Sequence, residues 1–281
     1  MTDTISRAVL ITGCSTGIGR VTAARLASRG HTVYATARRL SDISDLADAG
    51  CRTLQLDVCD EASMHAAVAA VQQAEGAVGV LVNNAGYGQD GPIEEVPIDV
   101  VRRQFETNVF GLVRMTQLVL PGMRRQRWGR IVNVSSMGGK LVFPGGGFYH
   151  ATKFAVEAIS DALRFEVRGF GIDVSVIEPG AIRTRFGETS VESMAAAAAE
   201  ASPYAAFNAG VEQRVQATYR GMLATGPDIV AKAIERAITA KRPRTRYPLT
   251  PGARTMLFLR RALPDRAWDA LMRTQFPSPR A

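Results

Sequence analysis

The stretch Arg7-Ala8-Val9-Leu10-Ile11-Thr12-Gly13-Cys14-Ser15-Thr16-Gly17-Ile18-Gly19 decides the fold. Its first six residues are mostly Val, Leu, Ile and Ala, an apolar run typical of a buried strand. A turn with three glycines follows, and residues 20–29 then have helical periodicity. This order indicates phosphate binding, because glycines let the backbone approach a pyrophosphate and a helix N-terminus offers free N–H groups. A plain strand-to-helix turn with incidental glycines is the less favoured alternative.

The end of the second expected strand, residues 31–36, favours one form of a dinucleotide over the other. A fold of this kind that prefers NAD places a carboxylate here to bind the ribose 2′-hydroxyl. The sequence instead reads Ala37-Arg38-Arg39, and the nearest acid downstream is Asp42. Arginines suit a 2′-phosphate, so we predict NADP(H), with Arg38 as its ligand and a further hydroxyl from Ser15. The alternative is that both arginines belong to a solvated loop.

Strands and helices alternate along most of the chain. Further strands are expected at 52–56, 78–82, 130–136 and 172–177, with helices at 40–49, 61–75, 97–106, 109–125 and 149–168. This alternation predicts an α/β fold with a doubly wound parallel sheet, in one domain that covers residues 1–281. Residues 187–222 break the rhythm and are interpreted as a helical substrate lid. A helix at 227–240 and a last strand at 245–248 follow.

Polar residues follow two of these strands and interrupt one helical region. Asp57 ends the third strand, where it suits either an adenine amino group or a turn. The fourth strand runs into Asn83-Asn84-Ala85-Gly86, and we expect the asparagine pair both to bind the cofactor and to hold the strand end. Asn108 lies where the helical pattern breaks, around residues 107–109. If buried it needs hydrogen-bond partners, so a satisfied core amide is the alternative to a functional role.

A serine, a tyrosine and a lysine form the candidate catalytic group. Tyr149 and Lys153 are four residues apart at the start of a long helical pattern, which puts both on one helix face. A nearby ammonium favours the phenolate and lowers a tyrosine pKa that is otherwise near 10. Ser136 ends the preceding strand, where its hydroxyl can hold a carbonyl oxygen. For the Tyr–Lys spacing alone simple packing is the better interpretation, but the rest of the chain argues against it.

Composition restricts the setting. The chain has 281 residues, 46% of them hydrophobic, and contains no apolar run long enough to span a bilayer. Its three cysteines, Cys14, Cys51 and Cys59, match no disulfide or metal-ligand spacing, so we expect no metal site and a reduced, cytoplasmic setting. No nucleic-acid motif accompanies the net charge of +8, and nucleic acid is not expected as a partner.

The whole positive excess lies in residues 241–281, which hold ten basic residues against Asp265 and Asp269. Residues 249–281 are interpreted as a basic amphipathic C-terminal extension. Trp268, Leu271, Met272 and Phe276 recur there at helical spacing and form one apolar stripe. Such a stripe most often packs on its own domain or on a neighbouring subunit, which we favour. A membrane surface is the alternative.

Taken together, these motifs resemble the short-chain dehydrogenase/reductase family over about the first 190 residues, and more weakly its hydroxysteroid and retinol dehydrogenase branch. The resemblance implies a Rossmann-type fold and a catalytic tetrad of Asn108, Ser136, Tyr149 and Lys153. The usual 13-residue separation from the tyrosine selects Ser136 over Ser135, and Thr152 stands where the family often has Ser. The implied cofactor-binding residues are Gly13, Ser15, Gly17, Ile18, Gly19, Arg38, Asp57, Val58, Asn84, Ala85, Gly86, Tyr149, Lys153, Pro179, Gly180, Ile182 and Thr184.

The resemblance also implies hydride transfer between a nicotinamide and a carbonyl carbon. Ser136 would orient the oxygen, Tyr149 would transfer its proton, Lys153 would lower the tyrosine pKa and hold the ribose, and Asn108 would position a water. Family members are often dimers or tetramers, so a homodimer or homotetramer is expected. A non-catalytic NADP(H) sensor or scaffold is the alternative, although it would not need all four tetrad side chains.

The expected substrate is a lipophilic ketone or aldehyde, or the matching alcohol. Apolar side chains are concentrated in the loop before Tyr149 and in the expected lid. They are Leu141, Val142, Phe143, Phe148, Phe186, Met194, Tyr204 and Phe207. For any one of these side chains, packing of the lid onto the body of the protein is the favoured interpretation.

Overall fold

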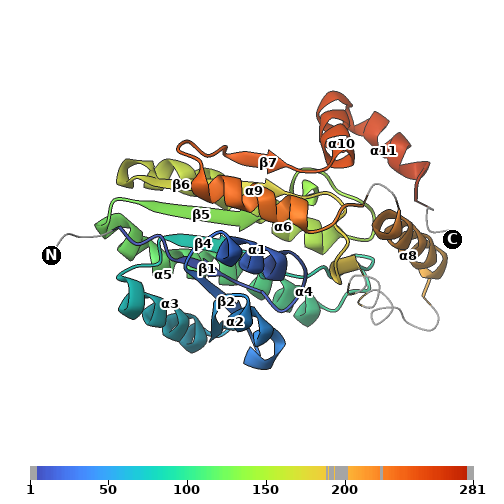
Figure 1. Cartoon of the computed structure of the whole chain (residues 1–281). Coiled ribbons are helices and arrows are strands. Elements are labelled where there is room, and N and C mark those ends of the chain that lie inside the picture. The colour runs from blue at the N-terminus through green and yellow to red at the C-terminus, as the bar shows by residue number, and fades with distance from the viewer. Residues whose placement is uncertain (1–4, 188, 190–192, 194–201, 222–223, 277–281) are drawn as a thin grey trace.

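Seven parallel strands form one sheet at the centre of the computed structural model, which describes residues 5–187, 189, 193, 202–221 and 224–276 (Figure 1). The strand order is β3-β2-β1-β4-β5-β6-β7, and every neighbouring pair is parallel. The strands are β1 (Val9–Ile11), β2 (Val33–Ala37), β3 (Arg52–Gln55), β4 (Val80–Asn83), β5 (Gly129–Val134), β6 (Ile172–Glu178) and β7 (Arg246–Pro248). The predicted doubly wound sheet is confirmed. Its chain order reverses between β1 and β4, where such sheets bind ligands at the carboxyl ends of the strands.

Helices cover both faces of the sheet, because side chains alternate along each strand. Val9 and Ile11 belong to one buried cluster and Leu10 to another. The first cluster takes in α1 (Gly17–Ser28), α2 (Asp45–Asp48) and α9 (Asp228–Thr239). The second takes in α3 (Glu61–Glu75), α5 (Gly111–Arg125) and α6 (Gly147–Val167).

Helix boundaries differ from the sequence prediction at two informative places. Helix α1 begins at Gly17, inside the glycine turn, and not at residue 20. The expected break around residues 107–109 is a π-helical turn, Glu106–Phe110, that joins α4 (Ile98–Phe105) to α5 without interruption. Such turns are rare and often accompany functional sites. Elsewhere the agreement is close, and α3 begins after Asp60, whose carboxylate accepts from Ala62 and Ser63 N–H.

The C-terminal stripe packs on its own chain. After β7 the chain forms α10 (Pro251–Ala262) and α11 (Asp265–Arg273), which lie near α8 (Ala205–Arg220) (Figure 1). Trp268, Met272 and Phe276 are buried in one cluster with Leu141 and Val211. This is the arrangement that the sequence favoured over a membrane surface. No helix of the described ranges is long and apolar enough to cross a membrane.

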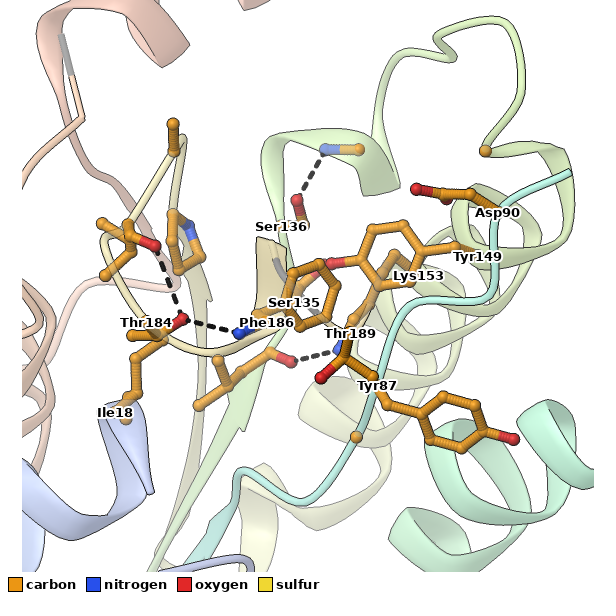
Figure 2. Close-up of a pocket in the computed structure, with 18 of the residues that line it drawn as sticks. Ile18, Tyr87, Asp90, Ser135, Ser136, Tyr149, Lys153, Thr184, Phe186 and Thr189 are labelled. Atoms are coloured by element: carbon orange, nitrogen blue, oxygen red, sulfur yellow. Dashed lines mark hydrogen bonds between the residues drawn. The ribbon is translucent and has the colours of Figure 1, made fainter. Parts of the chain in front are cut away.

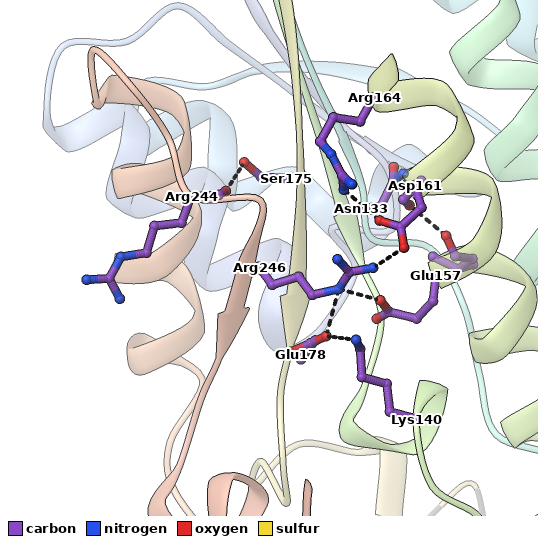
Figure 3. A network of polar contacts seen from close by, with 11 residues as sticks. Asn133, Lys140, Glu157, Asp161, Arg164, Ser175, Glu178, Arg244 and Arg246 are labelled. Carbon is purple, nitrogen blue, oxygen red and sulfur yellow. Dashed lines mark hydrogen bonds and ion pairs between the residues drawn. The ribbon is translucent and has the colours of Figure 1, made fainter. Parts of the chain in front are cut away.

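A polar network joins the last two strands to α6 (Figure 3). Arg246 Nε on β7 lies 3.1 Å from Glu157 Oε2 and 3.3 Å from Glu178 Oε1, and its Nη2 lies 2.7 Å from Asp161 Oδ2. Lys140 Nζ reaches Glu178 Oε1 at 3.6 Å. Both glutamate side chains are almost fully buried, with 8% and 3% exposure, so this arginine is shared between two buried carboxylates.

Candidate active site

A large cavity, about 1040 Å³ in volume, opens at the carboxyl ends of the strands. The turn after β1, the ends of the other central strands, α6, α8 and the chain after α11 all contribute to its walls. Of the residues singled out from the sequence, those that line it are Gly13, Ser15, Gly17, Ile18, Arg38, Asp57, Val58, Asn84, Ala85, Gly86, Ser136, Tyr149, Lys153, Pro179, Gly180, Ile182 and Thr184. Among the catalytic and cofactor-binding residues that the resemblance implies, the two that do not line it are Gly19 and Asn108.

The glycine turn has the backbone geometry of a phosphate cradle. Gly13 and Gly17 have φ values of +74° and +58°, which favour glycine. A Cβ atom on Gly13 would come within 2.9 Å of Ala85 Cα. Gly19 does not line the cavity. A Cβ atom on it would lie 2.4 Å from Gly13 O, so this glycine lets α1 approach the turn closely. The cradle therefore fits a dinucleotide pyrophosphate at the start of α1.

Asn84 and Thr12 hold this cradle in place. Asn84 Nδ2 donates to Thr12 O at 2.9 Å and to Gly13 O at 3.0 Å. Thr12 Oγ1 accepts from the N–H groups of Asn84 and Ala85, both at 3.0 Å. Asn83 turns the other way, and its Nδ2 donates to Asn133 Oδ1 at 2.9 Å. We expected the pair both to bind the cofactor and to hold the strand end; both side chains make such holding contacts, and Asn84 also lines the cavity.

The two arginines after β2 have different surroundings. Arg38 lines the cavity, and no ion pair to it occurs among the described residues. Arg39 lies 3.1 Å from Asp42 and is turned outward. Asp57 lines the same end of the cavity, with Oδ1 accepting from Cys59 N at 2.9 Å. The solvated-loop alternative thus suits Arg39, whereas Arg38 is placed to meet a ligand.

Ser136 and Tyr149 meet at the centre of the cavity (Figure 2). The end of β5 positions the serine and the first turn of α6 positions the tyrosine. Ser136 Oγ accepts from Gly138 N at 3.0 Å, so its own proton is free to be donated. The Ser136 hydroxyl also hydrogen-bonds to the Tyr149 phenol. Phe186 packs against the tyrosine ring in a tilted arrangement, with ring centroids 5.2 Å apart.

Burial controls the protonation of both Tyr149 and Lys153. It raises the pKa of Tyr149 to about 12, against the opposing effect of the Ser136 hydrogen bond. It lowers the pKa of Lys153 to about 8, while the Glu157 carboxylate acts in the opposite direction. Lys153 Nζ lies 5.8 Å from the Tyr149 ring centroid and donates to Val134 O at 2.9 Å. The lowered tyrosine pKa expected from the sequence is thus not a property of the protein alone, because burial outweighs the Ser136 hydrogen bond, which acts in the lowering direction.

Asn108 lies behind the cavity wall as a fully bonded amide. Its Oδ1 accepts from Tyr87 N at 3.1 Å, and its Nδ2 donates to Tyr87 O at 2.9 Å and to Thr152 Oγ1 at 3.1 Å. Thr152 in turn donates to Tyr149 O at 2.7 Å. The side chain of Asn108 is therefore a buried amide with hydrogen-bond partners, which was the alternative to a functional role. The threonine, which looked like a neutral variation in the sequence, connects the π-helical turn to the first turn of α6.

Several lining residues escaped the sequence analysis. Tyr87, Asp90 and Tyr219 all line the cavity, and the Tyr219 ring is tilted against that of Phe186 with centroids 6.4 Å apart. Burial raises the pKa of Tyr219 far above its usual range. Tyr219 shares one face of α8 with Val211 and Val215, so the four-residue spacing was a usable signal. Tyr87 and Asp90 belong to an irregular segment, for which no periodicity exists.

The apolar side chains expected to meet substrate have different positions. Phe143 and Phe186 line the cavity, and Leu141 packs behind it. Val142 is exposed, and Tyr204 donates its hydroxyl to Glu94. Phe148 and Phe207 are not among the lining residues. Met194 lies outside the described residues.

Comparison with known proteins agrees with this geometry. The model of the short chain dehydrogenase family matches residues 7–195. The uncharacterized oxidoreductase YbbO of Escherichia coli is 35% identical over 269 residues, covering 95% of this chain and 94% of its own. The 17-beta-hydroxysteroid dehydrogenase type 1 of Mus musculus is 38% identical over 256 residues, or 85% of this chain and 72% of its own. The 3-ketodihydrosphingosine reductase of Bacteroides thetaiotaomicron is 43% identical over 178 residues, or 63% and 65%.

Solved structures show the same fold. A short-chain dehydrogenase from Streptomyces avermitilis is similar with a TM-score of 0.79 and 34% identity, covering 96% of this chain and 98% of its own. A closed form of serine dehydrogenase complexed with NADP+ has a TM-score of 0.76 and 29% identity, covering 87% and 95%. A short-chain dehydrogenase/reductase from Burkholderia phymatum, in complex with NAD, has a TM-score of 0.78 and 26% identity, covering 100% and 99%. From its motifs, its sheet and these matches, the chain belongs to the short-chain dehydrogenase family of oxidoreductases.

Proposed function

We propose that the protein is an NADP(H)-dependent oxidoreductase that interconverts a lipophilic ketone or aldehyde and its alcohol. The observation that carries the proposal is the convergence of Ser136, Tyr149 and Lys153 on the cavity that also contains the glycine turn. A carbonyl group between the serine and the tyrosine would lie within reach of two hydroxyl donors. The bound dinucleotide would supply the hydride.

The protein's own groups would orient the substrate and transfer the proton. Ser136 would donate to the carbonyl oxygen, because its acceptor side is already bonded to Gly138 N. Tyr149, kept protonated by burial, would act as the general acid in reduction. Lys153 has ammonium protons besides the one bonded to Val134 O, and these would bind the ribose of the nicotinamide. A positive charge near the phenol would then favour the phenolate form needed for alcohol oxidation.

Arg38 supports NADP(H) over NAD(H). It is the arginine of the pair that lines the cavity, whereas Arg39 is occupied by Asp42. The similar serine dehydrogenase binds NADP+, but the similar Burkholderia protein binds NAD, so the residue and not the family argues for the phosphate. Thr184 and Ile182 line the cavity, and the family resemblance implies that they would contact the nicotinamide end.

The walls on the substrate side support a lipophilic compound. Phe143, Phe186, Val211, Val215 and Met256 are apolar residues that line the same cavity as Tyr149. Two relatives are named for a hydroxysteroid and for 3-ketodihydrosphingosine, which are both largely apolar. Apolar walls with a few placed polar groups are typical of sites for such ligands.

A turnover assay tests the proposal. Purified protein with NADPH and a panel of steroid and long-chain ketones should oxidise the cofactor, whereas short hydroxy acids and sugars should not be substrates. Tyr149→Phe should abolish turnover and leave NADPH affinity within about twofold, because only the proton donor is lost. A protein that binds NADPH but never oxidises it would instead be a sensor. Near-normal activity of Tyr149→Phe would refute the assignment of the acid.

A further inference from the structure

His150, the residue after the candidate acid, is held between α6 and the loop that follows Ser136. This loop, residues 137–148, is called the serine loop here. The imidazole is only 6% exposed, and both ring nitrogens bond to main-chain atoms of the loop. Nδ1 lies 2.9 Å from Gly138 O, and Nε2 lies 3.2 Å from Phe143 N. One side chain thus fixes two points of the loop that are five residues apart in the sequence.

These two bonds permit a single protonation state. A carbonyl oxygen can only accept a hydrogen bond, so Nδ1 must carry a proton. A backbone N–H can only donate, so Nε2 must be unprotonated. The ring is therefore neutral with its proton on Nδ1. Protonation of Nε2 would place its N–H opposite the N–H of Phe143. The hydrogen bond at this end of the loop would then be lost.

The loop backbone is shaped around this ring. A Cβ atom on Gly138 would lie 2.4 Å from His150 Nδ1, and one on Gly146 would lie 3.0 Å from Nε2. The Gly138 N–H that Ser136 Oγ accepts belongs to the same residue whose carbonyl the histidine binds. Phe143, at the second contact, lines the cavity. The histidine is thereby connected both to the orientation of the serine and to the substrate wall.

We propose that His150 is a positioning residue that sets the serine loop, and through it the Ser136 hydroxyl and the Phe143 wall, relative to Tyr149. It acts through the loop and does not touch the reacting atoms. The kinetic part of this proposal rests on the proposed oxidoreductase function; the structural part does not.

Two titratable groups lie close to the ring. Tyr149 on the same helix is in edge contact, with ring centroids 5.6 Å apart. Asp90, from the segment after β4, approaches Gly146 from the cavity side, where a Cβ would lie 3.4 Å from its Oδ1. A carboxylate there favours protonation, whereas burial opposes it and lowers the pKa of His150. The loop bonds decide which form is present at neutral pH, because only the neutral ring satisfies both.

Nitrogen NMR tests the protonation state in the unaltered protein. The chain has three histidines, so long-range ¹⁵N–¹H spectra of ring-labelled protein are simple, and His65→Gln removes one exposed signal as an assignment control. We expect one ring at pH 7 with a protonated Nδ1 and a bare Nε2, and slow amide exchange at Phe143. A charged His150, or one protonated on Nε2, would overturn the proposal whether or not the protein turns over any substrate.

Kinetics of three variants tests the positioning role. His150→Leu should lower kcat/KM for the best carbonyl roughly tenfold to a hundredfold, leave the Kd of NADPH within about twofold and accelerate amide exchange at Phe143. His150→Gln can still accept from Phe143 N–H, and His150→Asn can still donate to Gly138 O, so each should recover part of the loss. The control His65→Gln should behave as the parent protein. Full activity in His150→Leu, or parallel losses of NADPH binding and activity in all three, would refute a role in positioning the loop.

Discussion

Glu178, at the end of β6, should destabilise the folded protein at alkaline pH. Its side chain is 3% exposed and lies close to both Arg246 and Lys140. Burial, followed by the neighbouring Glu157 carboxylate, raises its pKa from an ordinary value of 4.5 to about 7, and the two cations offset only part of this. Replacement by the neutral isostere, Glu178→Gln, removes the buried charge and keeps the shape (Figure 3).

The sign and size of this effect on stability follow from the coupling of protonation to folding. A carboxyl with a raised folded-state pKa contributes stability that is fully present below pH 4.5 and is lost as the pH rises through about 7. At about 1.4 kcal/mol for each pH unit, the rise corresponds to about 3 kcal/mol. We therefore expect Glu178→Gln to increase the free energy of unfolding by about 1 to 3 kcal/mol at pH 8.5, and by almost nothing at pH 4.5.

Urea denaturation at pH 8.5, 7 and 4.5 measures the difference directly. Asp161→Asn is the matched control in the same network. Burial pushes the pKa of Asp161 upward, but hydrogen bonds from Arg246 and Arg164 outweigh it and lower that pKa. The control should therefore be less stable than the parent at pH 8.5. If Glu178→Gln were also less stable there, the ion pairs of Glu178 would outweigh its desolvation, and the reasoning would be wrong.

Two further predictions concern the cofactor and the C-terminal extension. Arg38→Asp should weaken NADPH binding roughly tenfold to a hundredfold, the equivalent of about 1.5 to 3 kcal/mol for a charged hydrogen bond, and leave NADH binding nearly unchanged. Fluorescence titration measures both affinities, and equal losses for both cofactors would contradict the phosphate role. Trp268→Ala should lower the free energy of unfolding by about 3 kcal/mol, because the indole is buried among Leu141, Val211 and Met272. Urea denaturation measures this change, and Phe258→Ala is the control because Phe258 is an exposed residue of α10. Equal free energies of unfolding for the two variants would show that the stripe is not packed.

The sequence predicted the elements of the fold where physical periodicity is strong. The apolar run that forms β1, the glycine turn and the helical spacing of Tyr149 and Lys153 are all local signals. They were sufficient to place the cradle and these two side chains at one edge of the sheet. The π-helical turn at Asn108 was visible only as an interruption, because the Asn108 side chain bonds to Tyr87 and Thr152, which are distant in sequence.

The electrostatics of the site could not be predicted in the same way. Proximity of Lys153 to Tyr149 suggested a lowered tyrosine pKa, but desolvation depends on how completely Phe186 and the surrounding walls exclude water. The buried pair Glu157 and Glu178 lies on different elements, and only the sheet register brings Arg246 to it. Long-range burial, not local pattern, thus determines which charges the protein tolerates.

Helix α6 shows how the chemistry of the site depends on residues that never meet the substrate. Tyr149 and Lys153 face the cavity, while His150 binds the serine loop and Thr152 binds the π-helical turn. One turn further on, Glu157 joins the helix to β7. Three separate segments therefore fix the helix that carries the proposed acid. We expect the distance from Ser136 to Tyr149 to depend on the loop contact, because the turn and the strand contacts hold the helix itself. A substitution in the serine loop should consequently alter how the carbonyl is oriented without changing the cofactor cradle.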